Sequence, residues 1–133
     1  ADFHARCDKK GPTITVVSAK GVIFGGYTQY DWKSEPPHYP GNAEDYIYLL
    51  DPPVKLHCRE GAKHTVGCYS HCGPYFGGGS SGGFLITDEW DKSGDSWIDG
   101  TSCYGTPGEW QLYFKKHAGQ FSVTEIEVFL VRK

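Results

Sequence analysis

The pattern of hydrophobic and polar residues predicts a chain built mostly of β-strands. Residues 13–17 are β-branched throughout, and a turn at residues 20–21 leads into the apolar residues 22–24, which is typical of a β-hairpin. Residues 46–50 predict a buried strand that an Asp-Pro-Pro sequence ends. Further short strands are predicted at residues 54–57, 65–69, 84–86 and 110–114.

The last strand is predicted at residues 121–131, where apolar and polar residues alternate with one shift at Glu125. Its candidate core residues are Phe121, Val123, Ile126, Val128 and Leu130. A helix of one or two turns is expected at residues 2–8, before Gly11 and Pro12. Gly25 and Gly26 are expected to let the backbone bend before Tyr27.

Short strands, frequent turn signals and almost no helical periodicity favour a mainly β protein. We therefore expect a β-sandwich with one or two short helices, forming a single domain over residues 1–133. The net charge of −3 argues against a nucleic-acid partner, and no apolar run is long enough to insert into a membrane. Because the chain starts at Ala1 and contains no methionine, we expect a secreted, extracellular protein whose leader has been removed.

Five cysteines in a small chain also favour an oxidising compartment and disulfide bonds. An odd number predicts a disulfide-linked homodimer, or else one buried free thiol. Cys58, Cys68 and Cys72 are close enough in sequence for local pairing, which leaves Cys7 and Cys103 as interchain candidates. A zinc site is disfavoured because the spacing is poor for two tight ligand pairs in the set His57, Cys58, His64, Cys68, His71 and Cys72.

Five blocks of the sequence, in order along nearly the whole chain, resemble those of TLDc domains. They are RCDKKGPTITV at residues 6–16, FGGYT at 24–28 followed by Trp32, residues 43–50, GPYFGGG at 73–79 and VTEIEVF at 123–129. The resemblance implies a β-sandwich with few short helices and supplies no agreed catalytic residues. Intracellular members of that family are associated with oxidative-stress resistance and with the vacuolar proton pump. Other members carry the cysteine of the first block without a disulfide, which favours Cys103 over Cys7 as the interchain residue.

The chain departs from the family pattern after Phe84, at residues 88–100, which contain five acidic residues and two tryptophans. Calcium prefers several carboxylate and carbonyl oxygens from a flexible, glycine-bearing loop. We therefore expect this stretch to bind Ca²⁺, with a solvated acidic loop as the alternative. The metal-ligand candidates are Asp88, Asp91, Asp95 and Asp99.

Tryptophans beside carboxylates also suit sugar binding, because a ring stacks on the apolar face of a pyranose and carboxylates accept from its hydroxyls. The ligand-binding candidates are Trp97, Glu89, Trp90 and Tyr104, with core packing as the alternative for each aromatic residue. Trp97 is expected to face solvent and to stack on the sugar.

We therefore expect a secreted, calcium-dependent carbohydrate-binding protein (a lectin), with terminal galactose as the first candidate ligand. The alternative is a TLDc-like protein–protein interaction module that binds no sugar. An enzyme is not expected, because the sequence contains no catalytic triad motif, phosphate-binding loop or HExxH motif.

Overall fold

The computed structural model describes residues 2–19, 21–32, 44–50, 53–57, 66, 72–77, 83–87, 96–98, 104 and 119–131. Most of these residues lie in strands, as the sequence predicts. The elements, in chain order, are α1 (Asp2–Cys7), β1 (Thr13–Ala19), β2 (Val22–Thr28), β3 (Tyr46–Leu50), β4 (Pro53–His57), β5 (Cys72–Gly77), β6 (Gly83–Thr87), β7 (Ser96–Ile98), β8 (Gly119–Phe121) and β9 (Val123–Leu130).

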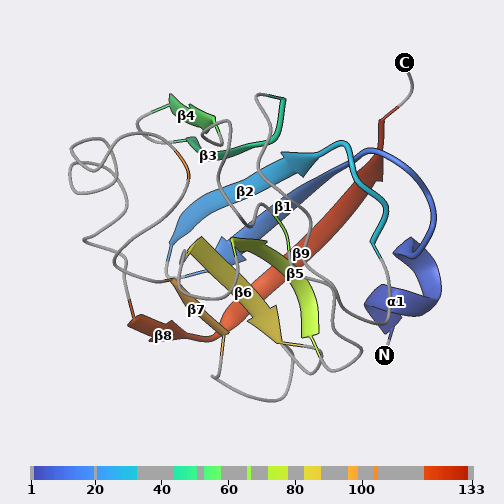
Figure 1. Ribbon diagram of the computed structural model, residues 1–133. Helices are drawn as coiled ribbons and strands as arrows, with labels where there is room; N and C mark the ends of the chain where they lie inside the picture. The colour runs from blue at the N-terminus through green and yellow to red at the C-terminus, as the bar shows by residue number, and fades with distance from the viewer. Residues whose placement is uncertain are drawn as a thin grey trace.

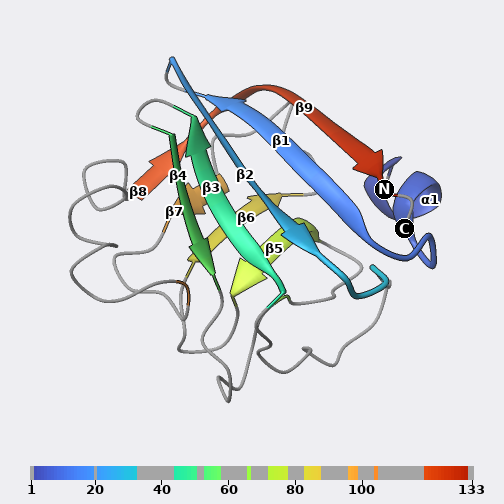
Figure 2. The ribbon, with the colours of Figure 1, turned by 90° about the horizontal axis from the view of Figure 1, so that it is seen from above.

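The strands form two antiparallel sheets that pack as a β-sandwich (Figure 1). One sheet has five strands in the order β4-β3-β2-β1-β9, and the other has four in the order β5-β6-β7-β8. Figure 2 looks onto the five-stranded sheet, with the four-stranded sheet behind it. This architecture confirms the predicted mainly β sandwich with little helix.

Aromatic rings from both sheets meet in the hydrophobic core. Phe24 of β2 contacts Phe84 of β6 edge to face, with ring centroids 5.1 Å apart. Phe76 of β5 stacks on Phe84 at 5.0 Å and meets Trp32 edge to face at 5.6 Å. These rings are almost fully buried. They stabilise the packing of the two sheets, because aromatic pairs in favourable geometry add to the free energy gained by burying apolar area.

Alternation along β1 shows which face of the five-stranded sheet meets the core. Thr13, Thr15 and Val17 are fully buried, whereas Ile14 and Val16 between them are only partly buried. Trp32 fixes the polar end of this row, because its indole Nε1 donates a hydrogen bond of 2.9 Å to Oγ1 of Thr13. Two apolar residues of β1, Ile14 and Val16, therefore lie on the outer face, away from the second sheet.

Hydrogen bonds tie the segment before β1 to residues 31–32, which follow β2. The Lys9 amide donates to the Trp32 carbonyl at 3.0 Å, and the Gly11 amide donates to a carboxylate oxygen of Asp31 at 2.7 Å. Gly11 has a φ of 79°, a left-handed conformation that favours glycine. The predicted short helix at residues 2–8 is confirmed as α1, and the chain turns into β1 at Gly11 and Pro12.

Gly25 and Gly26 do not bend the backbone, because both lie inside the paired strand β2. A Cβ atom on Gly25 would clash with the carbonyl oxygen of Thr15 and lie 2.7 Å from the hydroxyl of Tyr48. A Cβ atom on Gly26 would lie 2.6 Å from the ring of Phe76. The prediction of a bend is wrong, since these glycines permit close approach on the two faces of one strand.

The shift of alternation in the last strand is real, and it lies at a β-bulge. Val123 pairs with Ala19 and Glu125 pairs with Ser18, so Thr124 is the extra residue. Val123 is buried, and Ile126 and Val128 are half-buried on the inner face, as predicted. Leu130 is 59% exposed at the end of the strand, so its prediction as a core residue is wrong.

Two other predicted strands lie mostly or wholly outside the described residues. Of residues 65–69 only Val66 is described, as an isolated bridge to Phe76. Residues 110–114 are not among the described residues, and neither is the side chain of Phe121. The predicted hairpin and the strands at residues 46–50, 54–57 and 84–86 are confirmed as β1–β2, β3, β4 and β6.

Candidate functional site

Most of the predicted ligand and metal residues lie outside the described residues. These are Asp88, Glu89, Trp90, Asp91, Asp95 and Asp99. The strands on either side of them are described: β6 ends at Thr87, and β7 covers Ser96–Ile98. The two strands pair antiparallel, with Phe84 opposite Ile98 and Leu85 opposite Trp97. Residues 88–95 therefore connect two neighbouring strands of one sheet.

The acidic stretch is not one continuous loop, because β7 interrupts it. Trp97 lies in a strand that pairs on both sides, opposite Leu85 of β6 and Gln120 of β8. The expectation that Trp97 faces solvent stays a prediction, because only its backbone is among the described parts of the chain. Three residues are too few to give a period-2 pattern, which explains why the sequence did not reveal this strand.

Tyr104 is a core residue. Its side chain is fully buried, and its ring lies 6.4 Å from that of Phe76. A ring without accessible surface cannot stack on a ligand. Tyr104 therefore packs in the core, which was the alternative given for each aromatic candidate. Its assignment to the sugar site is wrong.

The described residues form another surface with the character of a binding site: the outer face of the five-stranded sheet. We define the outer face as the residues whose side chains alternate with the buried ones. They are Ile14, Val16, Ser18, Ile23, Tyr27, Tyr46, Tyr48, Leu50, Pro53, Lys55, His57, Glu125, Glu127 and Phe129. Three of the large hydrophobic residues that are substantially exposed lie here: Ile23 at 42%, Leu50 at 53% and Phe129 at 50%.

A groove of about 510 Å³ runs across the outer face between β1 and β4. Aliphatic side chains of β1, two tyrosines of β3 and the residues around the β3–β4 turn line it. Such a groove is suited to apolar or aromatic groups, because its walls offer few hydrogen-bonding partners. Leu50 and Phe129 add exposed apolar surface on the same face.

Tyr46 is the centre of an aromatic cluster on the outer face. Its ring stacks on Tyr27 at 5.4 Å with an interplanar angle of 22°, and it lies 5.6 Å from the ring of His57. The ammonium of Lys55 lies 4.4 Å from the centre of the Tyr46 ring, within cation–π range. The neighbours on β2 and β4 therefore hold this ring in place.

Tyr48 lies over Gly25, and its hydroxyl donates a hydrogen bond of 2.9 Å to the carbonyl oxygen of Thr15. The missing side chain of Gly25 provides the space that the phenol occupies. Burial, and then the neighbouring Tyr46, raise the pKa of Tyr48 to about 12. Tyr48 therefore stays protonated at physiological pH and forms part of the floor of the groove.

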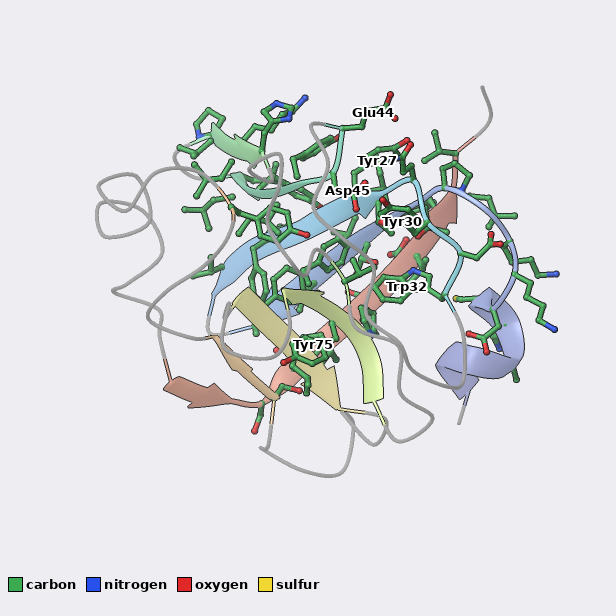
Figure 3. All side chains as sticks on the ribbon, viewed as in Figure 1. Tyr27, Tyr30, Trp32, Glu44, Asp45 and Tyr75 are labelled. Atoms are coloured by element: carbon green, nitrogen blue, oxygen red, sulfur yellow. The ribbon has the colours of Figure 1, made fainter. Side chains whose placement is uncertain are left out.

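A buried carboxylate organises the ends of β2 and β3, beside the outer face. Asp45 accepts hydrogen bonds from Oγ1 of Thr28 at 2.7 Å and from the amide of Gln29 at 2.9 Å. Figure 3 shows Asp45 and Glu44 grouped with Tyr27 and Tyr30 at this end of the strands, whereas Tyr75 lies apart on the second sheet. Because Asp45 bonds to β2, we interpret it as a structural residue that aligns β3 with β2.

Among the described residues, no three His, Cys, Asp or Glu side chains come together as a metal-binding group. Cys7 is a free, half-buried thiol, and burial followed by Asp8 raises its pKa. In the described part of the chain, no helix has the length and hydrophobicity to cross a membrane.

Sequence reasoning missed the outer face. The sequence does contain a signal for this second apolar face, because apolar or aromatic residues occupy both faces of β1 and β3. In β1 the inner positions include Thr13 and Thr15 beside Val17 and Ala19, so hydrophobicity alone does not identify the face that meets the core. The pairing of β1 with β2 and β9 is what identifies the outer face.

In a comparison with known protein families, a family model described as the TLDc domain matches residues 1–132. Among curated proteins, no sequence matches the chain.

Proposed function

The chain belongs to the TLDc domain family, and from this premise we propose that it is a secreted, calcium-dependent carbohydrate-binding protein. Family membership supports a binding module. The proposal of a calcium and sugar site is based on the connection between β6 and β7. Asp88 follows the last residue of β6, and Asp95 precedes the first residue of β7, so antiparallel pairing brings both attachment points to one end of the sheet.

The proposed calcium ligands are Asp88, Asp91 and Asp95, all within residues 88–95. Asp99 is a weaker candidate, because the extended strand β7 lies between it and Asp95. Four residues of extended chain span roughly 13 Å. The ligand oxygens of one calcium ion lie only about 2.4 Å from the metal. We therefore propose that Asp99 lies outside the calcium site.

The proposed sugar site uses an aromatic ring beside these carboxylates. Trp90 lies in the same connection and Glu89 is its neighbour in sequence, so both are proposed to contact the sugar. Trp97 stays a candidate, from a strand that borders the connection. Calcium coordinates vicinal hydroxyls of a pyranose, which would link the metal and the sugar in one site, and terminal galactose is our first candidate ligand.

We also propose a disulfide-linked homodimer, since two sites in one molecule allow crosslinking of glycans and raise avidity. Cys103 is the proposed interchain residue. The half-burial of Cys7 supports this choice, because burial raises the pKa of its thiol and so disfavours the thiolate that disulfide exchange requires.

A glycan array probed with the purified protein tests the proposal, once with calcium and once with a chelator. We expect binding to galactose-terminated glycans that the chelator abolishes. Binding that survives the chelator would refute the role of calcium, and no binding to any glycan would refute the lectin function. A gel without reductant tests the covalent dimer separately.

The second candidate function is binding of a protein partner without sugar. The exposed aromatic groove on the outer face favours it, because tyrosine-rich surfaces are frequent in protein interfaces. An array without glycan binding, combined with an intact fold, would leave this candidate as the better one.

A further inference from the structure

The outer face carries opposite charges on its two edge strands, with apolar and aromatic residues between them. Lys55 lies on β4 at one edge, and Glu125 and Glu127 lie on β9 at the other. Lys55 and Glu127 are both exposed. The face is therefore complementary to a surface with the reverse order of charges.

The register of the sheet aligns these charges. One row across the five strands contains Lys55, Tyr48, Gly25, Val16 and Glu127. The next row on the same face contains His57, Tyr46, Tyr27, Ile14 and Phe129. Both rows have β2, the middle strand of the sheet, at their centre.

A second copy of the same face supplies the reverse order if it is turned by a two-fold axis parallel to the strands. Such an axis above β2 places β4 of one copy opposite β9 of the other. Each residue keeps its position along the strand direction. Lys55 then faces Glu127 of the second copy, and Glu127 faces the second copy's Lys55. An axis across the strands would instead place β4 on β4 and β9 on β9, which opposes like charges.

The residues between the charged ends also match under this symmetry. Tyr48 faces Val16 and Tyr46 faces Ile14 of the second copy, so each tyrosine ring meets an aliphatic side chain. Packed sheets lie about 10 Å apart, and their strands cross at an angle of about 30°. This angle shifts each edge strand by roughly 5 Å along the strand direction, relative to the strand that it faces. Lysine and glutamate side chains are long enough to span both displacements.

We propose that the outer face is a non-covalent, self-complementary dimer interface for a second copy of this chain. This proposal rests neither on the proposed sugar site nor on the interchain disulfide. Five strands spaced about 4.8 Å apart and about 20 Å long give roughly 500 Å² per copy. The total of roughly 1,000 Å² is at the lower end for specific interfaces, so the dimer is weak and depends on concentration.

Sedimentation in the presence of reductant tests the proposal, because reductant removes any covalent dimer. We expect the unmodified protein to show a monomer–dimer equilibrium. Lys55→Glu and Glu127→Lys should each weaken self-association at least tenfold, since each creates two like-charge pairs. Lys10→Glu, a charge reversal of an exposed residue away from the outer face, should leave the dimer unchanged.

Mixing the two variants gives the sharpest result. An equimolar mixture of Lys55→Glu and Glu127→Lys restores both opposite-charge pairs in the heterodimer and should regain the original affinity. The double variant Lys55→Glu/Glu127→Lys should regain it as a homodimer. Three results would overturn the proposal: a monomer at every concentration, a dimer that neither single reversal weakens, or no recovery in the mixture and the double variant. Calcium and glycan binding by the single variants should be unaffected. The outcome of this test is therefore independent of the outcome of the lectin test.

Discussion

Gly26 of β2 lies directly against the ring of Phe76 of β5, so close that an added Cβ atom would come within 2.6 Å of Cε1. This contact joins the two sheets at the centre of the core, because Phe76 also meets Trp32 and Phe84. The sandwich reaches its packing distance here only because one residue has no side chain.

Gly26→Ala should therefore lower the free energy of unfolding by about 1 to 3 kcal/mol, the usual cost of overpacking a core. Chemical denaturation would measure it. Phe76→Leu combined with Gly26→Ala should cost less than the sum of the two single changes, because a smaller side chain leaves room for the methyl group. Gly25→Ala should show no such recovery with Phe76→Leu, since its Cβ meets the backbone carbonyl of Thr15. An unchanged stability of Gly26→Ala would contradict the contact.

Two buried threonines of β1 should respond in opposite directions to the same substitution. Oγ1 of Thr13 accepts the hydrogen bond from Trp32, whereas Oγ1 of Thr15 has no partner among the described residues. Thr13→Val removes the hydroxyl that accepts from the indole N–H and should destabilise the fold by about 1 to 3 kcal/mol. Thr15→Val removes an unsatisfied hydroxyl and should raise the melting temperature. Equal effects of the two variants would refute this distinction.

The raised pKa of Tyr48 predicts a loss of stability at high pH. The folded protein holds the phenolic proton more tightly than the unfolded chain does, with a pKa of about 12 against 10.0. This stabilisation is complete below pH 10.0 and is lost as the pH rises toward about 12. Urea unfolding over that pH range should therefore show a steeper decline for the unmodified protein than for Tyr48→Phe. Parallel curves for the two proteins would contradict the assignment.

The elements that the sequence predicts well are those with a strong local signal. The β-branched run of β1 with its following turn, and the Asp-Pro-Pro sequence after β3, define strands and ends without any knowledge of the fold. The role of Gly25 and Gly26 depends on Tyr48 and Phe76, which come from other strands, so local sequence suggests only flexibility.

The faces of the strands were harder to predict than the strands themselves. Thr13 and Thr15 point into the core while Ile14 and Val16 lie outside. Trp32, which comes from a distant part of the sequence, supplies the hydrogen bond that satisfies Thr13 there. The candidate calcium site could be placed between β6 and β7 only once the short strand β7 was known. A strand of three residues leaves no periodic signal in the sequence.

The division of the acidic stretch by β7 makes the calcium proposal testable residue by residue. Asp88→Ala combined with Asp95→Ala should abolish the thermal stabilisation that calcium gives, because both residues adjoin the β6–β7 connection. A hundredfold excess of calcium over Kd stabilises a folded protein by about 2.7 kcal/mol, which a melting curve readily detects. Asp99→Ala, beyond β7, should keep most of this stabilisation and is the matched control. If Asp99→Ala loses the stabilisation by calcium and the double variant keeps it, the site lies at the other end of β7. If calcium does not shift the melting temperature of the unmodified protein, there is no calcium site in this fold.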